Sequence, residues 1–181
     1  VAWSEPHPEV SGRMLADVAR EWQCTQLEAC QRLQPGGAIY FQMREDDVRN
    51  VLRFEATMIG SDGLPHDKHP HPRLWGTFPR VLGHYARDLK LFPLEEAVHR
   101  MTGLSARRFN LAGRGEIAVG NHADLVVLDP APVIDRATYE HPTRMSSGID
   151  TVVVNGTVTW RDGRMSCERA GRFLARGAGH A

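Results

Sequence analysis

The chain has 181 residues, of which 41% are hydrophobic and 24% are charged, so it is long enough to build a domain with a hydrophobic core. Lys and Arg number 22, as do Asp and Glu, and no basic block stands out, which argues against binding to nucleic-acid phosphates or acidic membranes. The longest wholly apolar stretches, such as residues 125–128, are far shorter than the roughly 20 residues that cross a bilayer. We therefore expect neither a nucleic-acid partner nor a membrane partner.

The amino-terminal residues and the cysteines bear on where the protein is found. Residues 1–6 lack the charged and apolar regions of a signal peptide and contain no initiator Met, so we expect residue 1 to be a processing or cropping point in something larger. Cys24, Cys30 and Cys167 form an odd set without a C-x-x-C pair, which suits neither a disulfide framework nor a zinc ribbon. We expect three reduced thiols in a cytoplasmic protein.

Residues 11–110 carry mainly helical patterns, interrupted by two short apolar runs. Thr25 is placed to cap one helix, residues 45–47 supply the acidic first turn of another, and Pro93 suits the first residue of a third. A loop rich in Pro and His covers residues 65–73. In chain order, we predict helices over 14–22, 25–33, 45–52, 78–89 and 93–101, and strands over 38–41 and 57–60.

This alternation of strands, loops and helices is typical of a parallel α/β sheet or barrel. Only two strands precede residue 110, and two parallel strands can neither close a barrel nor cover both faces of a sheet. After Gly115 the pattern changes to short β-rich runs, and Asn155-Gly156 between two of them predicts a type I′ hairpin, since both positions require a positive φ. Asp162-Gly163 predicts a second tight turn, and residues 168–181, rich in Arg, Gly and Ala, should fray.

Asp62 is the first candidate for a catalytic group. It follows the predicted buried strand 57–60 and lies between Ser61 and Gly63, where α/β enzymes keep catalytic carboxylates. An Asp in such a place also serves as a helix cap or stabilises a loop, and the local pattern leaves both interpretations open.

The run His66-Asp67-Lys68-His69-Pro70-His71-Pro72 brings three His residues together. The H-x-x-H-x-H spacing does not place them on one helix face, and no nearby carboxylate or Cys completes a zinc ligand set with obvious geometry. The prolines hold the segment extended. We expect a rigid loop whose imidazoles make hydrogen bonds, with a metal site as the alternative.

Three further side chains suit substrate binding. Arg73 ends the loop, and its planar fork of donors, close to Asp62, can grip a carboxylate through two bonds or simply brace the loop. Tyr40 and Met43, near the end of the run 38–41, can line a side-chain pocket or join the core. Neither G-x-x-x-x-G-K-[ST] nor G-x-S-x-G occurs, which argues against phosphate-cradling and serine-nucleophile chemistry.

Segments along almost the whole chain resemble the amidohydrolase superfamily. The segment GEIAVGNHADLVVLD at 115–129 matches its G-x-I-x-x-G-x-x-A-D-L-V-V-hydrophobic-D pattern, and 152–156 followed by Gly163 matches its closing hairpin. Upstream segments look like the D-aminoacylase branch, which comprises the N-acyl-D-amino-acid deacylases. These segments are Gly12-Arg13, Gly37–Met43, Met58–Asp67 and His69–Phe78.

The resemblance implies a fold of the α/β class. Residues 1–110 would form the last strands and helices of a metal-dependent (β/α)8 barrel, and residues 111–165 the carboxy-terminal part of a small β-sandwich or barrel domain. Residues 166–181 would be a tail. The chain would thus be a fragment of the complete protein.

The resemblance also implies a zinc-dependent hydrolase that cleaves the linear amide C–N bond of a small-molecule N-acyl-D-amino acid. Asp62 matches the aspartate that takes a proton from zinc-bound water and delivers it to the leaving nitrogen. Arg73 matches the arginine that binds the substrate carboxylate, and Met43 a residue lining the pocket for the amino-acid side chain.

The metal ligands of that family are an H-x-H, a bridging Cys or Glu, and two further His. All lie on earlier strands, so we expect them upstream of Val1 and none within this chain. Alone, the chain should have little or no activity; it should need the rest of its own barrel or self-associate through exposed strand edges. The alternatives are an amidohydrolase acting on a cyclic amide, and a non-catalytic binding or interaction module.

Overall fold

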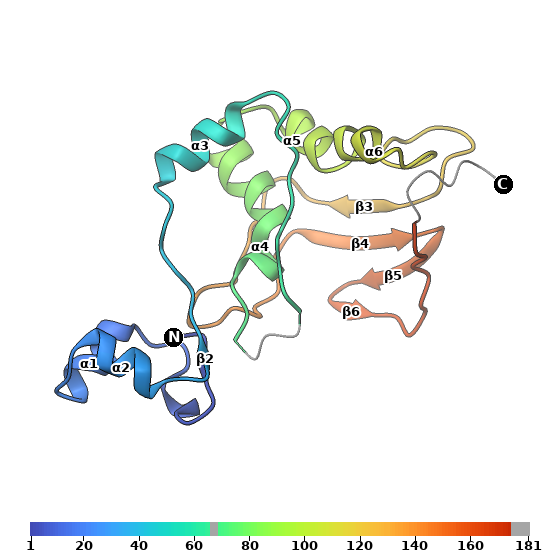
Figure 1. Ribbon diagram of the computed structural model, residues 1–181. Coiled ribbons are helices and arrows are strands. Elements are labelled where there is room, and N and C mark those ends of the chain that lie inside the picture. Colours follow the sequence, from blue (N-terminus) through green and yellow to red (C-terminus); the bar gives the residue numbers. More distant parts are fainter. Residues whose placement is uncertain (66–68, 175–181) are drawn as a thin grey trace. The chain divides into compact units, whose positions relative to one another are not determined.

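The computed structural model describes residues 1–65 and 69–174, which form two compact units (Figure 1). The first, which we call the loop unit, comprises residues 1–44, 61–76 and 136–145. The second, which we call the sheet unit, comprises residues 45–60, 77–135 and 146 onward. His66 in the predicted loop and residues 175–181 in the predicted tail lie outside the described residues.

The loop unit contains a small apolar core of Val10, Val18 and Leu33. Its second helix begins as predicted, because Thr25 Oγ1 accepts the Glu28 N–H at 3.2 Å while Glu28 Oε2 accepts the Thr25 N–H at 2.8 Å. The elements in chain order are β1 (Trp3–Ser4), η1 (Pro8–Val10), α1 (Leu15–Glu21), α2 (Gln26–Arg32) and β2 (Gly36–Gly37).

The strand predicted at residues 38–41 is wrong. Strand pairing falls on the two glycines just before it, where β2 runs antiparallel to β1 and the Ala2 N–H donates to Gly37 O at 2.8 Å. Glycine permits this close approach, since a Cβ at Gly36 would lie 2.6 Å from the Leu33 carbonyl oxygen. Within the described chain, residues 38–41 pair with no strand and continue as a loop.

The helices of the sheet unit pack around a core that includes Leu52, Tyr85 and Ala97. Pro93 is the N-cap of its helix and not the first helical residue, so the helix begins one residue later than predicted. The helix predicted over 78–89 is confirmed, although it starts earlier and its second half has π-helical geometry. The helices are α3 (Glu45–Arg53), α4 (Arg73–Arg80), which begins in the loop unit, η2 (Val81–Asp88), α5 (Leu94–Met101) and α6 (Gly103–Phe109).

The buried strand predicted at residues 57–60 is also wrong. These residues form a half-buried loop, held by backbone bonds from the Thr57 N–H to Phe54 O at 3.0 Å and from the Ile59 N–H to Arg100 O at 3.2 Å. A strand needs a neighbouring strand to receive its hydrogen bonds, and the described residues supply none at this place. The buried Arg100 side chain instead joins α5 to the end of α3, with its NH1 group donating to Phe54 O at 2.9 Å.

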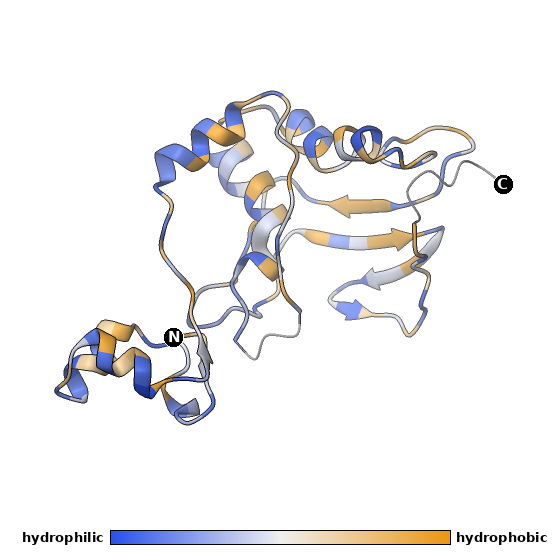
Figure 2. Cartoon of the chain, in the orientation of Figure 1, coloured by the Kyte–Doolittle hydropathy of each residue, from blue (hydrophilic) through white to orange (hydrophobic). Residues whose placement is uncertain are grey.

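An antiparallel meander forms the rest of the sheet unit (Figure 1). Asn155 has φ 48° and Gly156 φ 81°, which confirms the predicted type I′ hairpin, and Asp162 and Gly163 make the second tight turn with φ 48° and 78°. Edge strand β3 is apolar along its whole length (Figure 2). The strands are β3 (Leu125–Leu128), β4 (Ile149–Val154), β5 (Thr157–Arg161) and β6 (Arg164–Met165).

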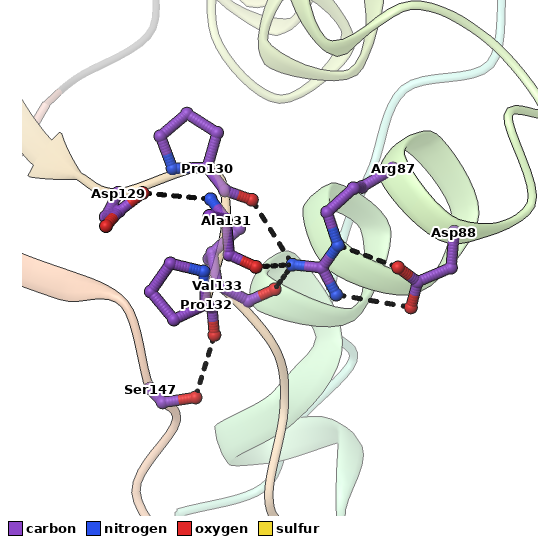
Figure 3. A network of polar contacts seen from close by, with 8 residues as sticks. All are labelled: Arg87, Asp88, Asp129, Pro130, Ala131, Pro132, Val133 and Ser147. Carbon is purple, nitrogen blue, oxygen red and sulfur yellow. Dashed lines mark hydrogen bonds and ion pairs between the residues drawn. The ribbon is translucent and has the colours of Figure 1, made fainter.

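The segment after β3 is anchored to η2 by the guanidinium of Arg87 (Figure 3). Its NH1 group donates to Ala131 O at 2.8 Å and to Val133 O at 2.7 Å, while Nε donates to the Asp88 carboxylate at 2.7 Å. Val133 is fully buried, and Gly83 of η2 contacts its carbonyl so closely that no side chain fits there. Three backbone carbonyls in all, those of 130, 131 and 133, converge on one nitrogen.

Candidate active site

Asp62 lies in the loop that leads into α4. Its φ is 49°, a left-handed conformation that Asp tolerates better than most residues, and its side chain is 83% exposed. The loop is tight on either side, because the Gly63 N–H donates to Ser61 Oγ at 3.3 Å and a Cβ at Gly63 would lie 2.6 Å from the Leu74 side chain. The backbone therefore places the carboxylate at the surface, beside the first turn of α4.

Arg73, the first residue of α4, contacts Asp62 directly. Arg73 Nε donates to the Asp62 backbone oxygen at 2.8 Å, and its NH2 group lies 2.8 Å from Asp62 Oδ2. The structure thus brings together the two residues that the sequence singled out as acid/base and as carboxylate ligand. Because the Arg73 and Asp62 side chains are 40% and 83% exposed, their ion pair is worth only about 0–1 kcal/mol.

His71 is bonded to the backbone of Arg73. Its Nδ1 accepts the backbone N–H of Arg73 at 3.0 Å, which satisfies a donor at the start of α4. Burial lowers the pKa of His71, the nearby Arg73 charge lowers it further, and the Asp62 carboxylate acts in the opposite direction. A neutral ring whose Nδ1 is an acceptor carries its proton on Nε2.

The other described imidazole of the Pro- and His-rich loop is engaged as well, since His69 Nε2 lies 2.6 Å from the Tyr139 carbonyl oxygen. These two bonds agree with a rigid loop whose imidazoles make hydrogen bonds. Within residues 1–65 and 69–174, no three His, Cys, Asp or Glu side chains gather where they could hold a metal ion. None of the helices in the same ranges has the length and apolar character needed to cross a membrane.

A pocket of about 230 Å³ opens in the loop unit, and its lining is mainly apolar. Tyr40, proposed from the sequence as a pocket residue, lines it, whereas Met43 is 69% exposed and lies outside the lining. Phe41 and Tyr139 also line the pocket and pack edge to face, with ring centroids 4.9 Å apart. Sequence reasoning missed both residues, because no local pattern reveals a pair so far apart in the chain.

The family model described as "Amidohydrolase family" matches residues 23–160. The chain belongs to the amidohydrolase family. The family assignment made from the sequence motifs is therefore confirmed, and this amidohydrolase's mixture of helices and sheets agrees with the predicted α/β class.

Known relatives resemble this amidohydrolase closely over a limited part of their length. It is 60% identical to the D-aminoacylase of Alcaligenes xylosoxydans xylosoxydans over 178 residues, which are 98% of this chain and 37% of the relative. A crystal structure of D-aminoacylase, described as defining a novel subset of amidohydrolases, superposes with a TM-score of 0.91 at 58% identity, over 96% of this chain and 37% of that one.

A second solved structure is that of N-acyl-D-glutamate deacylase from Bordetella bronchiseptica, complexed with zinc and a phosphonate inhibitor that mimics the tetrahedral reaction intermediate. It superposes with a TM-score of 0.85 at 52% identity, over 90% of this chain and 34% of that one. The amidohydrolase chain described here thus spans little more than a third of the length of the relatives that it matches.

Proposed function

We propose that this chain is the carboxy-terminal part of an N-acyl-D-amino-acid deacylase, and that it supplies both the acid/base carboxylate and the ligand of the substrate carboxylate. The contact between Asp62 and Arg73 carries the proposal. In an N-acyl amino acid, the amide nitrogen and the carboxylate are attached to the same carbon. A residue that protonates the nitrogen and a residue that binds the carboxylate must therefore lie side by side, as these two do.

Asp62 is the acid/base residue of the proposed reaction. Its carboxylate accepts a proton from the attacking water and returns it to the amide nitrogen as the C–N bond breaks, so that the amine can leave as a neutral group. Its exposure in this chain supports the role, because a carboxylate buried among structural partners would not reach a substrate.

Arg73 is the ligand of the substrate carboxylate. Its planar fork suits a carboxylate through two parallel bonds, and it holds the Asp62 carboxylate through one of its terminal nitrogens. A substrate carboxylate that replaces this weak contact leaves the Asp62 oxygen available for proton transfer. Binding of the substrate carboxylate to Arg73 would then release the Asp62 carboxylate to act as the base.

Tyr40, which lines the pocket of the loop unit, and Met43, which lies outside its lining, are proposed to contact the amino-acid side chain of the substrate. We also propose that residues 1–110 belong to the last part of a (β/α)8 barrel and 111–165 to a small β domain. The apolar edge strand β3 supports this division, since Val126 and Val127 are each more than half exposed and need cover from other parts of the protein.

The described residues do not fit a zinc site, because no group of three possible ligands occurs among them. We propose that the zinc ligands belong to the part of the deacylase that precedes Val1. We therefore expect the chain by itself to have little or no activity.

The test compares purified 181-residue chain with the complete deacylase that contains it, both supplied with zinc. We expect the complete protein to hydrolyse N-acetyl-D-methionine but not N-acetyl-L-methionine, and the chain alone to turn over neither. Turnover by the chain at a comparable rate would refute the predicted inactivity. A complete protein that hydrolyses cyclic amides only, or no amide at all, would overturn the proposed function.

A further inference from the structure

Three segments of the loop unit that are distant in sequence meet at Tyr139. Its ring packs edge to face against Phe41, with centroids 4.9 Å apart, and against His71, with centroids 5.3 Å apart and planes at 83°. Its backbone oxygen lies 2.6 Å from His69 Nε2. We call these four residues the Tyr139 cluster.

The Tyr139 cluster is not part of a hydrophobic core. Tyr139 itself is 39% exposed and Phe41 64% exposed, so burial alone does not explain why their rings meet. The backbone around Tyr139 is held by a turn, in which the Thr138 N–H donates to His141 O at 3.1 Å and the His141 N–H donates to Thr138 Oγ1 at 3.0 Å. These two hydrogen bonds hold the backbone that carries the Tyr139 ring.

Both partners of the Tyr139 ring lead directly to residues of the proposed substrate site. His71 contacts the Tyr139 ring and accepts the Arg73 N–H through Nδ1, so its imidazole is bonded to the first residue of α4. Phe41 contacts the same ring and lies beside Tyr40, two residues before Met43 in the loop proposed to line the side-chain pocket. One aromatic ring thus links the ligand of the substrate carboxylate to the proposed side-chain pocket.

We infer that Tyr139 is a positioning residue for substrate binding, which holds His71, and through it Arg73, in place against the loop that carries Tyr40. The inference rests on the proposed function, because it concerns the substrate site of the same enzyme. Edge-to-face pairs of this kind each contribute roughly a two- to tenfold factor in an equilibrium. Loss of the ring therefore weakens substrate binding without touching the reacting atoms.

The first experiment measures KM and kcat of the complete deacylase with N-acetyl-D-methionine. Tyr139→Ala raises KM by about three- to tenfold and changes kcat by less than about twofold, because it removes ring contacts and leaves Asp62 in place. Tyr139→Phe stays within about twofold of wild type, since it keeps the ring and the backbone oxygen. Phe109→Ala, which removes an exposed aromatic from α6, is the matched control and has no effect on KM.

The second experiment separates positioning of Arg73 from general loosening of the protein. With the carboxamide of N-acetyl-D-methionine, which offers no carboxylate, Tyr139→Ala leaves kcat/KM within about twofold of wild type. In the Arg73→Ala background, Tyr139→Ala adds no further rise in KM for the acid, because its effect passes through Arg73. If Tyr139→Ala does not fold, as judged by a lost melting transition, Tyr139→Leu is measured in its place.

Three outcomes overturn the inference and leave the proposed function intact. The KM of Tyr139→Ala is unchanged, its kcat/KM falls as much with the carboxamide as with the acid, or its rise in KM adds to that of Arg73→Ala. A wild-type protein without deacylase activity overturns the proposed function instead. The two failures are therefore distinguishable.

Discussion

Arg73 and Arg87 make bonds of the same kinds in the two units, yet we propose different roles for them. Each guanidinium donates to at least one backbone carbonyl and pairs with a carboxylate, and their side chains are similarly exposed, at 40% and 33%. Arg87 draws three carbonyls of a single segment onto one nitrogen, and its carboxylate partner, Asp88, is its neighbour in the chain. The carboxylate partner of Arg73 is Asp62, an exposed side chain from a separate loop.

The comparison indicates that the kind of partner, more than the exposure of the side chain, distinguishes the two arginines. Backbone carbonyls cannot leave, so the bonds of Arg87 serve to hold the segment after β3. An exposed carboxylate can turn away, so we propose that the contact of Arg73 with Asp62 is exchangeable. Substitutions around Arg73 should therefore change kinetics, and substitutions around Arg87 should change stability.

The largest expected effect is that of Asp62→Asn in the complete protein, which we propose to be a deacylase. We expect kcat to fall roughly a thousandfold, because the acid/base group is lost, while the free energy of unfolding changes by less than about 1 kcal/mol. Steady-state kinetics and thermal melting measure the two quantities. Asp162→Asn, which alters an exposed Asp with almost the same φ in the turn between β5 and β6, is the control and should change neither. A kcat within tenfold of wild type would exclude Asp62 as the acid/base.

Arg73→Ala should have the next largest effect. We expect KM for N-acetyl-D-methionine to rise about ten- to hundredfold with a smaller change in kcat, since a charge-assisted contact to the substrate carboxylate is lost. Arg73→Lys should restore only part of the affinity, because a lysine lacks the planar fork. Arg49→Ala removes an arginine of similar exposure whose Nε lies 3.1 Å from Glu45, and it serves as the control. An unaltered KM would mean that Arg73 binds some other ligand.

Local signals predicted the parts of this fold that local contacts build. Thr25 caps α2 and Asn155-Gly156 forms the turn of the β4–β5 hairpin, because a cap and a tight turn need only a few adjacent residues. The strand predicted at 57–60 was wrong, since its apolar pattern says nothing about whether a neighbouring strand is present. Asp62 and Arg73 were selected from motifs, and the structure places them in contact. Tyr139 was missed because its partners come from remote segments.

Arg87→Ala tests the other side of the comparison. We expect Tm to fall by about 3–6 °C, because three backbone carbonyls lose their common donor, and the kinetic constants to stay within about twofold of wild type. Differential scanning calorimetry and steady-state kinetics measure these effects. Arg164→Ala, at an exposed position in β6, should leave Tm unchanged. If Arg87→Ala instead raised KM and left Tm alone, the distinction between the two arginines would fail.

The smallest expected effect concerns pH and His71. Burial and the Arg73 charge lower the pKa of His71, against the opposing Asp62 carboxylate, so the folded protein binds this proton less readily than the unfolded chain. Its contribution to stability is complete above about pH 6.5, the ordinary value for histidine, and is lost as pH falls through the lowered pKa of the folded state.

His71→Asn keeps an acceptor for the Arg73 N–H but cannot titrate, so its Tm should fall less between pH 7.5 and pH 5.5 than that of the wild type, by about 1–2 °C. Melting curves at pH 7.5, 6.5 and 5.5 measure the difference. His141→Asn, at an exposed position of the same unit, should keep the wild-type slope. Equal slopes for His71→Asn and wild type would contradict the lowered pKa of His71 in the folded protein.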